Sequence, residues 1–137
     1  MFEVNYLAVL VTGVASMTIG ALWYSPLMFG NVWMKLNGFT MADMEKAKAK
    51  GMTGSYIIAF AGALLGAYVL AHFLQVFGAN SISEGLQVAF WAWLGFIVTT
   101  QVSGSLWEGK PWKLFLLNTA SSLVTLLVAS AILVSWV

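Results

Sequence analysis

The sequence lacks cysteine and arginine altogether, and it carries little charge of either sign. Of its 137 residues, 61% are hydrophobic and 8% are charged, whereas a soluble domain usually has about 25% charged residues. Six basic and five acidic side chains cannot cover the surface of a soluble protein of this length. The composition therefore excludes an ordinary cytosolic enzyme, a disordered chain and a nucleic-acid-binding protein. An integral membrane protein small enough to be one domain remains.

The missing residue types also exclude particular chemistries. Without cysteine there is no disulfide framework and no thiolate site, and without arginine there is no bidentate clamp for phosphate or carboxylate. The single histidine, His72, has no second histidine to pair with, and the five carboxylates are scattered, so a metal site is not expected. No catalytic Ser/His/Asp order and no glycine-rich phosphate loop is present. We expect no enzyme activity, no catalytic residue, no metal and no cofactor.

Four long apolar runs dominate the chain, at residues 4–23, 55–76, 86–106 and 114–136. Each has about the 20 residues that a helix needs to cross roughly 30 Å of hydrocarbon. None contains proline, and all are too long and too uniformly apolar for barrel strands. The flank of the first run is acidic, so we expect a retained span rather than a cleaved signal peptide. The sequence predicts an all-α membrane protein, with four transmembrane helices in an antiparallel bundle forming one domain over residues 1–137.

The first connection is the longest, at about thirty residues, and contains helix signals of its own. Thr40 is a candidate N-cap, Asp43 would lie near the positive end of the helix dipole, and Gly51 would stop the helix. These residues predict a short amphipathic helix on the membrane surface. The preceding segment, residues 27–36, is aromatic and apolar and is expected to lie in the membrane interface.

All six lysines fall in the first and third connections: Lys35, Lys46, Lys48, Lys50, Lys110 and Lys113. With four spans, these two connections share one side of the membrane, and the opposite side carries Glu3 and Glu84. Lysine-rich short loops stay in the cytoplasm. The sequence predicts that the first and third connections are cytoplasmic and that both termini are outside.

Small residues mark one candidate packing face on the second span. They are Ala59, Gly62, Ala63, Gly66 and Ala67, which include a G-x-x-x-G motif. Small residues let helix backbones approach closely within a membrane. We expect this helix to be the most closely packed of the four. Its partner helix belongs either to the same chain, which is the simpler interpretation, or to a second copy.

Polar residues gather at the lysine-rich ends of the other three spans. Gln101, Ser105 and Glu108 share one face of the third span, and Asn118 opens a polar face of the fourth. Polar groups in hydrocarbon usually face the bundle interior and mark functional sites. We call the following set the polar vestibule: Trp23, Tyr24, Ser25, Gln101, Ser105, Glu108, Lys110 and Asn118. The alternatives are hydrogen bonds that merely join helices and, for Glu108 and Lys110, an ordinary solvated turn.

An internal repeat is a further interpretation. Residues 20–23 (GALW) resemble residues 104–107 (GSLW) at an offset of 84 positions, and both copies end a span on the same side. This similarity indicates two repeated helical hairpins, as in some transporters. Chance matching in a chain rich in alanine, leucine and valine is the alternative.

Three blocks of sequence resemble a known family. They are residues 5–11 with 20–30, which include Trp23-Tyr24-Ser25-Pro26; residues 94–96 with 99–100; and residues 106–111 with 113–118, which include Glu108-Gly109-Lys110-Pro111. In these blocks the chain resembles the small bacterial membrane proteins catalogued as domain of unknown function 1761. The resemblance covers nearly the whole chain and implies a four-span protein of the bacterial cytoplasmic membrane. It implies no reaction, ligand or site.

Two functions remain open from the sequence. One is a self-associating structural or accessory subunit of a membrane assembly, suggested by the small-residue faces. The other is an oligomeric channel or transporter for a small solute or ion that uses the polar vestibule. The expected partners are membrane lipids and either further copies of the chain or the subunits of a larger membrane complex, and no nucleic acid.

Overall fold

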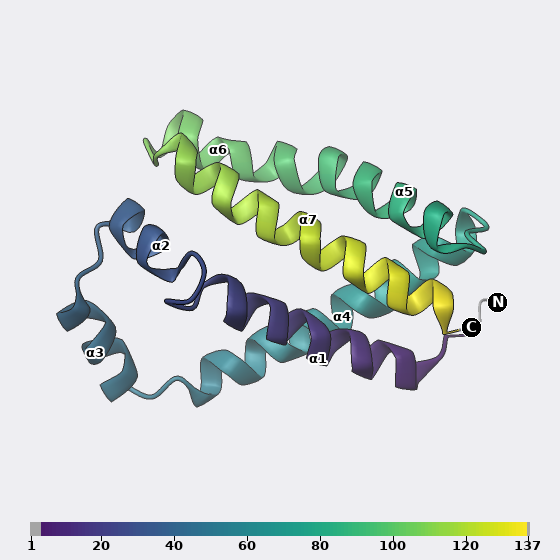
Figure 1. Ribbon diagram of the computed structural model, residues 1–137, viewed down its shortest axis with the longest axis horizontal. Coiled ribbons are helices and arrows are strands. Elements are labelled where there is room, and N and C mark those ends of the chain that lie inside the picture. The colour runs from purple at the N-terminus through teal and green to yellow at the C-terminus, as the bar shows by residue number, and fades with distance from the viewer. Residues whose placement is uncertain (1–3, 137) are drawn as a thin grey trace.

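The computed structural model describes residues 4–136 (Figure 1). Its described part is helical and contains no strand, and four of its helices are long and apolar enough to cross a membrane. They are α1 (Tyr6–Trp23), α4 (Thr53–Val76), the third span (Ile82–Trp107) and α7 (Trp112–Ser135). The prediction of an all-α chain with four such helices is confirmed. Glu3, which the sequence assigns to the acidic end, lies outside the described residues.

The third span is not one regular α-helix. It consists of α5 (Ile82–Ala92), the π-helical segment η1 (Trp93–Val98) and α6 (Thr99–Trp107). It begins four residues before the predicted position 86, because the Ser81 side chain caps the helix by accepting a hydrogen bond from the backbone N–H of Glu84.

The first connection holds two helices, α2 (Gly30–Asn37) and α3 (Met41–Ala49). The predicted cap of α3 is present: Thr40 and Asp43 exchange hydrogen bonds between their side chains and backbones. The described side chains of α3 are all exposed, whereas Trp33, Met34 and Leu36 of α2 are half-buried. The helix with a packed side in this connection is therefore α2, a segment for which the sequence predicts only an interfacial position.

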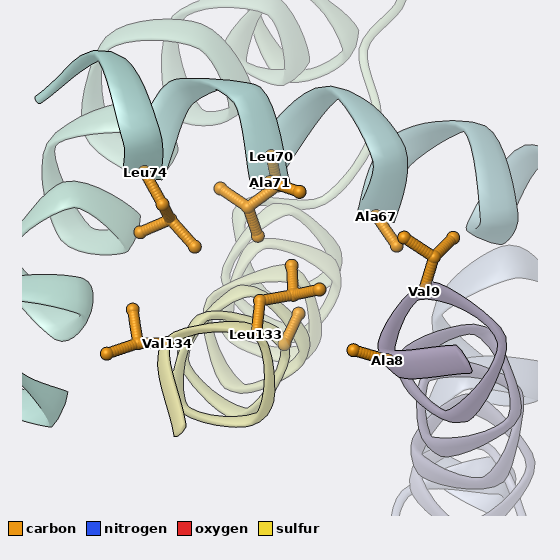
Figure 2. Close-up of a cluster of buried hydrophobic side chains, with 9 residues drawn as sticks. Ala8, Val9, Ala67, Leu70, Ala71, Leu74, Leu133 and Val134 are labelled. Carbon is orange, nitrogen blue, oxygen red and sulfur yellow. The ribbon is translucent and has the colours of Figure 1, made fainter. Parts of the chain in front are cut away.

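The other three long helices pack around α7, which contacts α1, α4 and the third span. Both described chain ends and the α4–α5 connection lie at one end of the molecule, and the other two connections lie at the opposite end (Figure 1). Figure 2 shows the buried apolar cluster near the chain termini, where Ala8, Leu70, Leu74 and Leu133 come together from three helices. At this end the Asn5 amide also donates a hydrogen bond to the Trp136 carbonyl, at 3.2 Å.

One close small-residue contact lies between α5 and α7. Ala89 is fully buried, and a methyl group added at Gly85 would collide with the Val134 side chain. Small residues at these two positions allow α5 to lie directly against α7.

The predicted packing face on α4, in contrast, is mostly exposed. Ala59, Gly62 and Gly66 are exposed, and a methyl group added at either glycine would meet open space. Only Ala67 of the five residues is buried, and Ala63 is half-buried. The interpretation that this whole stripe packs inside the chain is therefore wrong, because α1 and α7 cover the neighbouring face of α4, at Leu70, Ala71 and Leu74.

Candidate functional site

A tight turn between α1 and α2 builds one wall of the site. The backbone N–H of Phe29 donates to the Trp23 carbonyl at 3.0 Å, and that of Gly30 donates to the Ser25 carbonyl at 2.8 Å. A side chain at Gly30 would collide with the backbone carbonyls of Tyr24 and Ser25. Because this glycine permits such close contact, the chain turns back at once and α2 packs beside α7.

The result is a polar cleft between α2, α6 and α7. It consists of an inner hollow of about 470 Å³ and an outer hollow of about 400 Å³, which share Trp33, Gln101 and Asn118 in their walls. The further residues of the inner hollow are Tyr24 and Ser122. The further residues of the outer hollow are Asn37, Thr100, Ser103, Gly104, Ser105, Glu108, Lys110, Leu114 and Phe115. Hydroxyl and amide groups dominate this lining.

Tyr24 and Asn118 form the central hydrogen bond of the cleft. The Tyr24 hydroxyl donates to Asn118 Oδ1 at 2.7 Å and so links the end of α1 to α7. Burial raises the pKa of the Tyr24 hydroxyl above its ordinary value, and a hydrogen bond with Ser121 lowers it by less. The phenol therefore stays protonated at neutral pH and keeps its role as a donor.

The π-helical segment sets the direction in which α6 presents its polar residues. Gly85, Ala89 and Trp93 face α7, and the Trp93 indole N–H donates to the Thr119 carbonyl at 2.7 Å. A regular helix would continue this face through positions 100, 104 and 107. A π segment accommodates one extra residue, which rotates the following helix by about 100°.

The face of α6 that the extra residue turns toward α7 passes through Gln101, Ser105 and Glu108, which line the cleft together with Thr100 and Gly104 beside them. The spacing of these three residues predicts that they share a face. Their direction, by contrast, depends on the π segment.

The mouth of the cleft carries opposite charges that pair with each other. Lys110 Nζ lies 3.3 Å from Glu108 Oε2, and both side chains are exposed. Gly109 between them has a φ of +71°, which favours glycine, and the Lys110 N–H donates to the Gly104 carbonyl at 3.1 Å. The α6–α7 connection is thus a compact turn that holds this pair at the edge of the cleft.

Six of the eight residues of the predicted polar vestibule line the cleft, and Trp23 and Ser25 do not. The Ser25 hydroxyl donates to the Leu22 carbonyl, and the Trp23 ring packs against Phe29. Asn118 accepts its hydrogen bond from Tyr24, whereas no hydrogen bond joins it to Gln101 among the described residues. The sequence did not assign Trp33 and Asn37 to the site, although their spacing of four positions places both on one face of α2.

Two polar groups near the polar cleft lack hydrogen-bonding partners. The Ser105 hydroxyl and the Trp23 indole nitrogen are buried without a hydrogen bond among the residues that the structure describes. A buried polar group without a partner is costly, and Ser105 carries this cost beside the outer hollow that it lines. Within residues 4–136, no three His, Asp or Glu side chains gather in a way that could hold a metal ion.

One family model matches the chain. It is described as "Protein of unknown function (DUF1761)" and matches residues 7–134. The comparison with curated proteins and the comparison with solved structures each gave no match.

Proposed function

The chain belongs to the family of unknown function DUF1761, and we propose that it spans a membrane and passes a small polar solute by way of the polar cleft. The observation that carries this proposal is the amide of Gln101, which faces the cleft with no hydrogen-bonding partner among the described residues. An amide left unpaired in hydrocarbon costs several kcal/mol. Water or a solute in the cleft removes that cost.

The depth of the cleft supports the same proposal. Gln101 lies six residues before the end of α6, and Asn118 lies six residues after the start of α7. At 1.5 Å per residue, both amides lie about 9 Å inside the ends of their helices. A solute that reaches them has therefore entered the span rather than remained at its surface.

The lining favours an uncharged solute. The inner hollow is lined by Tyr24, Trp33, Gln101, Asn118 and Ser122, none of which is charged at neutral pH. The charged residues at the mouth, Glu108 and Lys110, pair with each other. An ion transferred into such a site would lose its hydration without gaining a counter-ion, which is very costly.

The path through one copy is interrupted. A second cavity of about 710 Å³ opens at the opposite end, with Asn5, Gln75 and Asn80 among its lining residues. Its walls include Ala8 and Leu74 of the buried apolar cluster. A solute would cross this cluster only when helices move or when several copies combine, so a carrier or an oligomeric channel fits better than an open pore.

Flux through proteoliposomes tests the proposal. Vesicles containing the protein are assayed with glycerol as a neutral probe and with potassium as an ionic probe. We expect glycerol flux above that of empty vesicles, little potassium flux, and loss of glycerol flux when Gln101→Leu and Asn118→Leu are combined. Gln87→Leu, an exposed amide on α5, is the matched control and should leave the flux unchanged. Absence of flux, or flux that survives the double substitution, would overturn the proposal.

We further propose the orientation in which the lysine-rich end faces the cytoplasm. Five of the six lysines belong to the two connections at the end of the molecule that holds α2 and α3, and Lys113 is the second residue of α7 at the same end. Basic loops are retained on the cytoplasmic side. A fluorescent protein that matures only in the cytosol should stay dark when fused to the C-terminus. A bright fusion would reverse the assignment.

Self-association is a second candidate function, because the α4 stripe faces outward. Ala59, Gly62 and Gly66 are exposed, and space is open above both glycines, as helix–helix contact between copies requires. Native mass spectrometry from gentle detergent would count the copies. Gly62→Leu with Gly66→Leu should reduce the oligomer to monomer, and Ala61→Leu, an exposed position off the stripe, should not. A monomeric wild-type protein would exclude this role.

A further inference from the structure

A lateral groove lies between α4 and α5, at the end where they are joined. The two helices diverge from their short connection (Figure 1), and the groove between them has a volume of about 650 Å³. Phe73 and Phe77 line it from the side of α4, and Trp91 and Phe96 line it from the third span. Glu84 and Gln87 lie nearer the connection. The groove is thus apolar along its length and polar toward one end.

The groove runs from the boundary of the span toward its middle. Glu84 is the third residue of the span Ile82–Trp107. Phe96 lies twelve residues farther along, about 18 Å deeper at 1.5 Å per residue. The hydrocarbon core of a bilayer is about 30 Å thick, so the inner end of the groove lies in the region of lipid acyl chains. At this depth, acyl chains rather than water are available to contact the apolar walls of the groove.

Glu84 gives the groove a carboxylate with which no lysine in the described chain pairs. Its Oε1 accepts a hydrogen bond from the neutral Ser81 hydroxyl at 3.2 Å, which supplies no counter-ion. All six lysines are at the opposite end, and among residues 4–136 the ion pair that the structure shows joins Lys110 to Glu108. A cationic group that carries N–H donors is the natural complement of this exposed carboxylate.

We propose that this groove binds one phospholipid with a primary ammonium headgroup, its acyl chain lying between the Phe73/Phe77 and Trp91/Phe96 walls and its ammonium paired with Glu84. The carboxylate repels anionic headgroups, and a choline headgroup lacks the N–H donors that Glu84 accepts. The site is independent of the polar cleft, which lies at the other end of the molecule. Loss of one therefore does not imply loss of the other.

Native mass spectrometry of the full-length protein tests this assignment. The detergent-solubilised protein is titrated with phosphatidylethanolamine, phosphatidylcholine or phosphatidylglycerol carrying identical acyl chains. We expect phosphatidylethanolamine to bind best and phosphatidylglycerol to bind worst. Glu84→Gln should remove the preference for phosphatidylethanolamine over phosphatidylcholine, a loss of about fivefold, as for a partly exposed ion pair. Trp91→Ala should weaken all three lipids together, because it removes a wall of the groove.

Two controls separate the charge from the fold. Ser81→Ala removes the helix cap and leaves the carboxylate, so it should keep the lipid preference. Glu45→Gln removes an exposed carboxylate from α3 and should also keep it. Equal binding of the three lipids by the wild-type protein would overturn the assignment, as would a preference that persists in Glu84→Gln. Loss of the preference in Ser81→Ala would instead attribute the effect to the fold.

Discussion

Trp93 and Thr119 are joined by a hydrogen bond of 2.7 Å, in which the indole Nε1 donates to a backbone carbonyl of α7. Thr119 is almost fully buried, and its own hydroxyl already donates to the Phe115 carbonyl at 2.8 Å. The bond therefore anchors the first residue of the π segment to the central helix. It fixes the point from which α6 turns toward the cleft.

Trp93→Phe should destabilise the protein, because it removes this donor and keeps most of the aromatic volume. We expect a loss of about 1 kcal/mol, the usual value for one such bond, measured by unfolding in mixed detergent micelles. Trp91→Phe is the matched control, since Trp91 is 64% exposed and makes no hydrogen bond in the described structure. Equal losses in the two variants would show that ring size, rather than the hydrogen bond, sets the stability.

Shortening the π segment by one residue should turn the polar face of α6 away from the cleft. Deletion of Phe96, which is 62% exposed, would let the segment become a regular α-helix and rotate the residues after it by about 100°. The natural chain has no cysteine, so cysteines placed at Gln101 and Asn118 can be joined by a short thiol-reactive cross-linker. We expect cross-linking in the full-length chain and its loss in the deletion variant.

Phe96→Ala is the control for this deletion, because it removes the same ring and preserves the length of the segment. Cross-linking should persist in Phe96→Ala. A deletion variant that cross-links as well as the full-length chain would mean that the π segment does not determine where Gln101 lies.

The sequence could predict what depends on hydrophobicity and spacing. Long apolar runs identify four helices, and steps of four and three place Gln101, Ser105 and Glu108 on one face. The same three residues line one cleft in the structure. Residues 93–98 (WLGFIV), however, give no local signal for a π segment, and the hydrogen bond that holds its first residue, from Trp93 to the Thr119 carbonyl, is a tertiary contact. The direction of the polar face therefore depends on tertiary packing.

Two other features also depended on contacts that the sequence does not display. The position of α2 over the cleft depends on how closely Gly30 approaches the backbone of Tyr24 and Ser25, and glycine alone does not reveal such an approach. The motif at Gly62 and Gly66 could not show which side of α4 its neighbours cover. In the structure Gly85 and Ala89, which lie on another helix, are among the small residues that pack inside the chain.

Lowering the pH should destabilise helix α3, because Asp43 becomes protonated. Hydrogen bonds from the backbone N–H of Thr40 and then from its side chain hold the pKa of this carboxyl below its ordinary value of 3.8. The stabilisation is fully present above pH 3.8 and is lost as the pH falls through the lower folded-state pKa, because the protonated carboxyl no longer accepts these bonds as an anion. Amide protection across residues 41–49, taken as the ratio of the intrinsic to the observed exchange rate, should therefore fall at low pH. Asp43→Asn should remove that pH dependence, and an unchanged acid response in the variant would assign it to another group.

Gly30→Ala should release α2 from the cleft. A methyl group at Gly30 would collide with the Tyr24 carbonyl and lie 2.8 Å from the Ser25 carbonyl oxygen, and backbone atoms cannot yield as a flexible side chain can. We expect a loss of about 1–3 kcal/mol, as for other overpacked sites, and faster thiol labelling of a cysteine placed at Asn37, which now lines the cleft. Gly20→Ala is the matched control, because a methyl group there would meet nothing within 4 Å, and it should leave labelling unchanged. If Gly30→Ala labelled as slowly as the control, the turn would not be what holds α2 over the cleft, and contacts of Trp33 with α7 would have to hold it instead.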